Sequence, residues 1–255
     1  MHESLRSIYG AVAGTLLVVL MCLASWFVPP GWNFVVTSAA FATFLAFLGQ
    51  AITQHPLGAL INERKLMSLS RFQMVVWTVV ILGGYGAFAA VRMRAGVPDP
   101  LSIEIEPQIW ALLGISATSF AAAPIVLGTK IVKEPAPGIC QETARAFNET
   151  EAEVDRNRAG VLYGNASITD ARWTDMFEGD ELKTTRYLDL GKVQMFFFTI
   201  LLVISYAAML FKTLSTTAPT ELVKFPVLSE GMIFLLGISH AGYLVNKGVT
   251  RTKTA

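Results

Sequence analysis

The residues best placed for chemistry are polar side chains that stand inside long apolar segments of this 255-residue chain. His240 is the only histidine in such a segment and Ser239 precedes it, while Ser116 and Tyr206 fall in two further apolar segments. Polar and ionisable groups inside a bilayer are costly and often mark an ion or proton path. We therefore predict a candidate intramembrane polar site of His240, Ser239, Ser116 and Tyr206. The alternative is a neutral imidazole that only joins helices, through a bond to Ser205, Tyr206 or a backbone carbonyl.

A second candidate is the segment 170–181, in which tryptophan and phenylalanine stand among five acidic residues. Aromatic side chains are enriched at the sites where proteins dock on one another. The residues that we expect to contact a cytoplasmic protein partner are Trp173, Asp175, Phe177 and Glu178. The alternative is a short amphipathic helix that packs beneath the membrane helices through Trp173, Met176 and Phe177.

Motifs for catalysis and metal binding are missing from the sequence. It contains no GxSxG, P-loop, HExxH or CxxC pattern. Its two cysteines, Cys22 and Cys140, are too few for a zinc site or a disulfide framework. We predict no catalytic residue, no cofactor and no metal site, and hence a protein that is not an enzyme.

The composition is typical of a protein with several membrane spans. Hydrophobic residues make up 53% and charged residues 15%, whereas soluble domains average about 25% charged residues. The net charge of +1 gives no basic surface for nucleic acid. Because a bilayer core needs roughly 20 apolar residues in a helix, we predict an all-α bundle of six membrane helices. The six windows are 8–28, 34–52, 72–91, 109–128, 193–211 and 232–245.

The distribution of charge predicts the orientation and the domain organisation. With six spans, most lysines and arginines fall on one side, which places both termini in the cytoplasm. Trp26, Trp32 and Trp110 then lie at the opposite interface. We expect an N-terminal hairpin, an amphipathic segment with a second hairpin, an acidic cytoplasmic insert, and a third hairpin with a basic tail. Their bounds are 1–55, 56–129, 130–190 and 191–255.

The second and third hairpins resemble each other. Gln73–Thr78 recurs as Gln194–Thr199, and Leu112–Ser116 recurs as Leu235–Ser239. An even number of spans separates the copies, so we predict a parallel repeat with a pseudo-twofold axis along the membrane normal. Such an axis can hold a pore, a pocket or a packed core. Gln73 is expected to close a capping box at the start of its helix.

Two connecting segments have patterns of their own. Apolar residues beside charged ones in 56–69 predict an amphipathic helix at the membrane surface. The insert 130–190 contains twelve acidic and eight basic residues, a net charge of −4. Its part from Glu142 to Arg158 is predicted to be helical.

Small residues spaced along 34–52 predict close helix packing or a homo-oligomer.

Four motifs carry a resemblance to known proteins. They are Ser68–Gln73, Trp77-Thr78, Asp189–Phe196 and Leu236–Tyr243. Together they resemble a group of uncharacterised bacterial inner-membrane proteins, and the likeness covers about residues 56–247. The resemblance implies a multi-pass protein of the bacterial inner membrane and implies no activity or site residue.

Two functions follow from these patterns. The first is a structural, signalling or assembly component that contacts membrane lipid and presents the insert to a cytoplasmic protein, without binding nucleic acid. The second is a channel or transporter with a path along the repeat axis near Ser116, Ser239 and His240. Flux through liposomes that changes with His240 would favour the second function.

Overall fold

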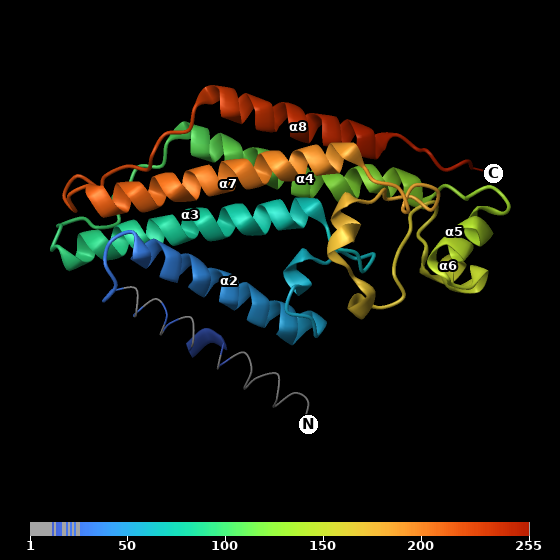
Figure 1. The fold of residues 1–255 in the computed structure, drawn as a ribbon, viewed down its shortest axis with the longest axis horizontal. Helices are drawn as coiled ribbons and strands as arrows, with labels where there is room; N and C mark the ends of the chain where they lie inside the picture. Colours follow the sequence, from blue (N-terminus) through green and yellow to red (C-terminus); the bar gives the residue numbers. More distant parts are fainter. Residues whose placement is uncertain are drawn as a thin grey trace. The chain divides into compact units, whose positions relative to one another are not determined.

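The computed structural model describes residues 12, 14–16, 19, 21, 23 and 26–254. In this part of the chain the structure is helical, and isolated β-bridges take the place of strands. The α-helices after residue 30 can be followed in Figure 1. They are α2 (Trp32–Thr53), α3 (Leu69–Arg94), α4 (Pro107–Ile131), α5 (Ile139–Phe147), α6 (Glu151–Asn157), α7 (Leu190–Thr216) and α8 (Glu230–Gly248). Three short 3-10 helices are η1 (Gly58–Leu60), η2 (Ile168–Asp170) and η3 (Trp173–Phe177).

Among the described residues, four helices are long and apolar enough to cross a membrane. They are α2, α3, α4 and α7, and they coincide with four of the six predicted windows. The described part of the chain is therefore all-helical, and its four long apolar helices indicate a membrane protein. The window 232–245 forms α8, which has 19 residues but is not among the four. The window 8–28 lies largely outside the described residues, as does Cys22.

The chain forms two compact units, each assembled from separate segments. The first unit comprises residues up to 59, 75–113 and 200–233, and the second comprises 60–74, 114–199 and 234–255. The long helices α3, α4 and α7 each contribute residues to both units. Each unit therefore combines three segments that are separated in the sequence.

Close helix packing and one buried arginine organise the first unit. A Cβ on Gly83 would lie 2.1 Å from Ser38 Oγ, so α2 and α3 approach closely at this glycine. Trp77 of α3 packs against Tyr206 of α7, with ring centroids 6.3 Å apart. Arg92 is buried and donates to the carbonyls of Asp99, Pro100 and Leu222, so one side chain fixes two loops.

The second unit contains the insert and a small core of its own. Ile139, Val154, Tyr163 and Leu182 of the insert pack around Leu66, which lies outside it. Gly160, at φ +59°, lets the insert approach the end of α4, because a Cβ there would lie 2.3 Å from the Lys130 carbonyl oxygen. The insert thus packs against the residues before α3 and against the end of α4.

Two local predictions need correction. The segment 56–69 is not an amphipathic helix at the membrane surface: it contains only η1 and a tight turn closed by the Ile61–Met67 bridge. Its apolar residues Leu66 and Met67 are buried by the protein itself, which removes the reason for a surface helix. The helical stretch from Glu142 to Arg158 is broken into α5 and α6, because Asn148 takes a left-handed conformation and Thr150 caps the next helix.

Candidate functional site

Four polar side chains from four different helices meet inside the second unit. Gln73 of α3, Ser119 of α4, Thr199 of α7 and His240 of α8 are at most 3% exposed. We call these four residues the neutral cluster. Since they carry no formal charge when the imidazole is neutral, their burial is possible as long as their hydrogen bonds are made.

The hydrogen bonds of the neutral cluster run from α7 to α4 through His240. The Gln73 amide donates to Thr199 Oγ1 at 2.5 Å and lies 3.3 Å from His240 Nε2. Thr199 in turn donates to the Met195 carbonyl. On the other side of the ring, His240 Nδ1 lies 2.5 Å from Ser119 Oγ.

This geometry is compatible with either neutral tautomer of the imidazole. When the Gln73 amide donates to Nε2, the proton is on Nδ1 and Ser119 accepts it. If the Gln73 carboxamide flips, its oxygen accepts from Nε2, and Ser119 donates to Nδ1. The flip exchanges the two ends of the carboxamide: the oxygen, which has no partner in the observed arrangement, would gain His240, and the amide nitrogen would lose both Thr199 and His240. The cluster therefore joins helices in either pattern, and one end of the Gln73 carboxamide is left without a partner in each.

The predicted role of Gln73 as a helix-capping residue is wrong. The helix α3 begins at Leu69, and the Gln73 side chain extends to α7 and α8 instead of the helix start. Its repeat counterpart Gln194 is exposed at the start of α7. The equivalent glutamines of the two hairpins thus occupy different environments.

The other predicted members of the intramembrane site are not part of this hydrogen-bonded cluster. Ser239 and Ser116 are buried in the second unit, and no partner is found for Ser116 Oγ. Tyr206 belongs to the first unit, where its ring packs against Trp77 and its hydroxyl has no hydrogen-bond partner. Of the four predicted residues, only His240 is bonded to the polar groups of neighbouring helices.

A second group of polar residues, unlike the first, is strongly charged. Asp180 of the insert lies 2.5 Å from Arg64, 3.3 Å from Lys192 and 3.1 Å from Lys247. We call these four residues the charged cluster. Arg64 precedes α3, Lys192 lies in the first turn of α7, and Lys247 lies in the last turn of α8. One carboxylate therefore connects three elements that are distant in the sequence.

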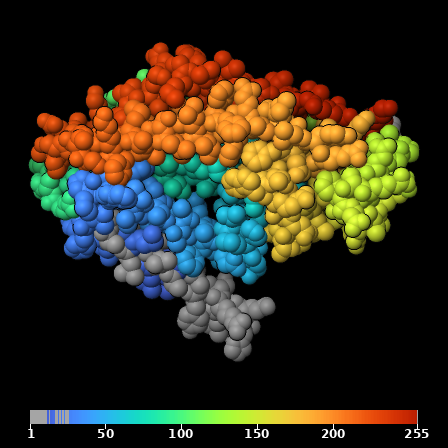
Figure 2. Space-filling view, viewed as in Figure 1, coloured from blue at the N-terminus to red at the C-terminus, as the bar shows by residue number. Residues whose placement is uncertain are grey.

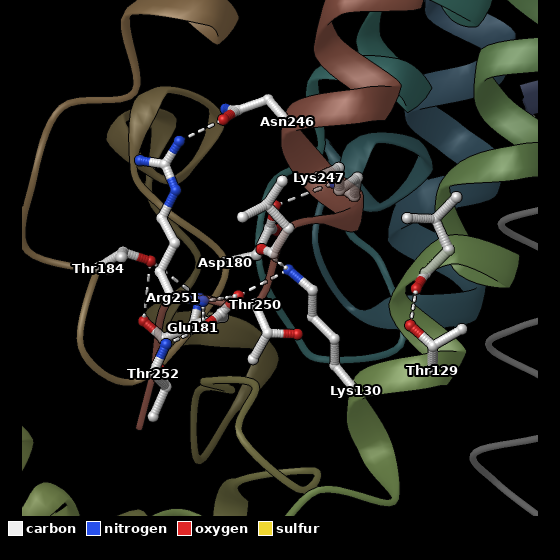
Figure 3. A network of polar contacts seen from close by, with 12 residues as sticks. Thr129, Lys130, Asp180, Glu181, Thr184, Asn246, Lys247, Thr250, Arg251 and Thr252 are labelled. Atoms are coloured by element: carbon white, nitrogen blue, oxygen red, sulfur yellow. Dashed lines mark hydrogen bonds and ion pairs between the residues drawn. The ribbon is translucent and has the colours of Figure 1, made fainter. Parts of the chain in front are cut away.

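The neighbouring Glu181 makes a second buried ion pair, which Figure 3 shows beside Asp180. Its carboxylate lies 2.6 Å from Lys130 Nζ of α4, and both side chains are about 3% exposed. The backbone N–H groups of Arg251 and Thr252 donate to the same carboxylate. Glu181 thus joins the end of α4 to the segment after α8.

The two carboxylates are held in the ionised form. Burial alone would raise the pKa of Asp180, but Lys192, Lys247 and Arg64 outweigh it and hold that pKa well below its usual value of 3.8. Burial opposes ionisation of Glu181 as well, and the bonds from Lys130 and from the backbone of Thr252 lower its pKa. Both ion pairs therefore persist at neutral pH.

The residues predicted to dock a partner are largely engaged within the chain. Trp173 meets the rings of Phe72 and Phe196 edge-on, with centroids 5.6 and 6.2 Å apart, and is 45% exposed. Phe177 packs on the same Phe196 ring at 5.1 Å. The element that contains them, η3, therefore rests on the first turn of α3 and the second turn of α7.

Asp175 within that element and Glu178 just after it also contact the rest of the protein. Asp175 is buried and accepts from the backbone N–H groups of Met67 and Arg172. Burial raises its pKa in spite of these bonds. Glu178 lies 4.0 Å from Arg172, and its carbonyl accepts from Lys192. Trp173 is the most exposed of the four predicted docking residues.

Comparisons with known proteins do not assign this chain to a family. No family model, curated protein or solved structure matches the chain. Within the described ranges, no group of three or more histidine, cysteine or acidic side chains is arranged to hold a metal ion. The resemblance to bacterial inner-membrane proteins stays a prediction from the sequence.

Proposed function

We propose that this chain is a structural or signalling component of a bacterial inner membrane that holds its acidic insert in a fixed position as a docking platform. The observation that carries the proposal is the attachment of the insert by Asp180 and Glu181. These neighbours pair with Arg64, Lys130, Lys192 and Lys247, which stand at or beside the ends of four helices. Breaking one partner of a buried ion pair costs several kcal/mol, so the insert is expected to move with the helices.

We also propose six crossings with both termini in the cytoplasm, an orientation that rests on the distribution of lysine and arginine in the sequence. The four cations of the ion pairs all belong to the second unit, as does the insert. Trp26, Trp32 and Trp110 belong to the first unit and are 37%, 58% and 57% exposed. Positive residues on the cytoplasmic side, with indoles at an interface, are the usual pattern of membrane proteins.

The surface offered to a partner is the polar face of α5 and α6. Figure 2 shows the side chains of these helices, in yellow-green, at the molecular surface. The exposed charged residues are Glu142, Arg145, Glu151, Asp155 and Arg156. Because three of these five exposed side chains are acidic and two are basic, we propose that the partner is a cytoplasmic protein with a basic surface.

Photo-crosslinking in intact cells tests this function. A crosslinking amino acid at Glu151 should capture one discrete soluble protein, and the charge reversal Glu142→Lys with Asp155→Lys should abolish the capture. The control is the same crosslinker at Ile125 of α4, which is 73% exposed on a candidate membrane span and should capture no soluble protein. Capture that is unaffected by charge reversal would reject the platform.

A channel or transporter stays as the second candidate, and the neutral cluster favours it. Gln73 Oε1 and Ser116 Oγ are buried without partners, as they would be along a path that takes up polar solutes. Proteoliposomes with the purified protein should show no flux of ions or small polar solutes if the platform is the function. Reproducible flux that falls in His240→Phe would replace the platform with a transport function along the proposed repeat axis.

A further inference from the structure

A cavity of about 370 Å³ lies in the second unit, between the start of α3 and the last turns of α4. This volume falls within the range of roughly 300–1,000 Å³ that is typical of sites for small molecules. One wall is apolar and comes from α4. Its residues are Phe120, Ala121, Ala123, Pro124, Leu127 and Ile131.

The opposite side of the cavity is cationic. Arg64, Arg71 and Lys247 line it, with Glu63 as the acidic residue among its lining side chains. The Arg71 guanidinium lies over the Phe120 ring, 5.7 Å from its centroid, so it stands where the apolar wall meets the polar side. The first turn of α3 adds the positive end of its helix dipole, since Ser70 and Arg71 also line the cavity.

These cations are incompletely neutralised by the protein. Arg64 and Lys247 share the single carboxylate of Asp180 with Lys192. Arg71 pairs with Glu63, whose side chain is 75% exposed and is therefore free to turn away into solvent. The Arg64 and Lys247 side chains are only 13% and 6% exposed, so their unbalanced charge is costly, and an anionic group in the cavity would lower that cost.

The apolar wall selects the kind of anion. It belongs to a candidate membrane span, and Ile131 at one end of it is 51% exposed. A free phosphate would satisfy the arginines but leave this wall without a partner. An acyl chain would cover the wall and continue along the exposed apolar side of α4, which includes Ile125.

We propose that this cavity binds one anionic phospholipid of the surrounding membrane, with its phosphate at Arg71 and its acyl chain along α4. Arg71 recognises the phosphate by donating hydrogen bonds from its planar guanidinium. Arg64 and Lys247, which also line the cavity, supply the remaining positive potential. This lipid site does not depend on a cytoplasmic partner, so it can hold even if the docking platform fails.

Nanodiscs that contain equal amounts of phosphatidylglycerol and phosphatidylcholine provide the test. Native mass spectrometry of the full chain released from them should show one retained phosphatidylglycerol. Arg71→Gln should lower the retained phosphatidylglycerol about tenfold, because a charge-assisted hydrogen bond is lost. The matched control Arg145→Gln changes an exposed arginine of α5 in the same unit and should retain the lipid.

A second pair of variants tests the apolar wall without touching any charge. Ala121→Trp fills the cavity and should abolish retention, whereas Ile125→Trp, on the same helix but outside the cavity lining, should not. The proposal is overturned if phosphatidylcholine is retained equally, or if Arg71→Gln and Ala121→Trp both leave retention unchanged. Displacement of the lipid by inorganic phosphate alone would also overturn it, since the site would then recognise a soluble anion.

Discussion

The neutral cluster is buried in the second unit and the charged cluster in the same unit is partly exposed, and the two stabilise it in different ways. The neutral cluster joins α3, α4, α7 and α8 through Gln73, Ser119, Thr199 and His240, so the helices supply every partner. Around the charged cluster, the helices and the residues just before α3 supply the cations, while the insert supplies Asp180 and the neighbouring Glu181. The helices alone would therefore leave several positive charges unpaired.

This difference suggests a division of roles. Hydrogen bonds between neutral groups in a membrane contribute about 0.6 kcal/mol each on average, so the neutral cluster specifies how helices meet more than it stabilises them. Removing one member of a buried ion pair costs about 3–5 kcal/mol. The charged cluster thus makes the helix ends dependent on the insert, which is what a fixed platform requires.

The largest expected effect is that of Asp180→Asn. It leaves Arg64, Lys192 and Lys247 without their shared carboxylate, and we expect the free energy of unfolding to fall by about 3–5 kcal/mol. Unfolding of the purified protein in detergent micelles by a denaturant series measures this loss. The control Glu142→Gln, at an exposed position of α5, should stay within about 0.5 kcal/mol of the wild type.

Acid should weaken the same attachment. The pKa values of Asp180 and Glu181 are lower in the folded chain than their ordinary values of 3.8 and 4.5. The unfolded chain therefore binds more protons, so their stabilisation is complete above those ordinary values and is lost as the pH falls below them. The difference in unfolding free energy between wild type and Asp180→Asn should shrink between about pH 5 and pH 3. A difference that is constant over this range would show that folding does not lower the pKa of Asp180, and so would contradict its stabilisation by Arg64, Lys192 and Lys247.

A smaller effect is expected from the neutral cluster. Gln73→Leu removes the bonds to Thr199 and His240 and should lower the free energy of unfolding by about 1 kcal/mol. Gln194→Leu is the matched control, because this glutamine occupies the corresponding place in the repeated motif but is exposed. Equal losses in the two variants would contradict the asymmetric arrangement of the two hairpins.

The sequence was sufficient to predict the long helices but not their polar contacts. Apolar stretches of the right length located α2, α3, α4 and α7, because length and hydropathy are local properties. His240 was identified as an intramembrane polar residue, whereas its partners Gln73, Thr199 and Ser119 were not, because they lie 41 or more residues away in the chain. Both Gln73 and Thr199 belong to the repeated motif. The recurrence of these polar residues in two apolar segments was the sequence feature that could have identified them as members of the site.

The charged cluster was missed for a different reason. Asp180 and Glu181 are two of five acidic residues in the segment 170–181, and their composition does not distinguish a buried carboxylate from a solvated one. The distinction depends on cations such as Arg64 and Lys247, which are far from Asp180 in the sequence and meet it only in the folded chain. Trp173 and Phe177 were predicted to form an outward surface, although their rings pack on Phe72 of α3 and Phe196 of α7.

Hydrogen exchange of the full chain in nanodiscs tests the central claim, that buried ion pairs fix the insert to the helices, most directly. We expect the backbone amides of residues 176–189 to be protected in the wild type to a degree comparable with the first turn of α7. In Asp180→Asn this protection should be lost, while the middle of α3 stays protected. Rapid exchange of residues 176–189 in the wild type would contradict the account, because the insert would then move independently of the membrane helices.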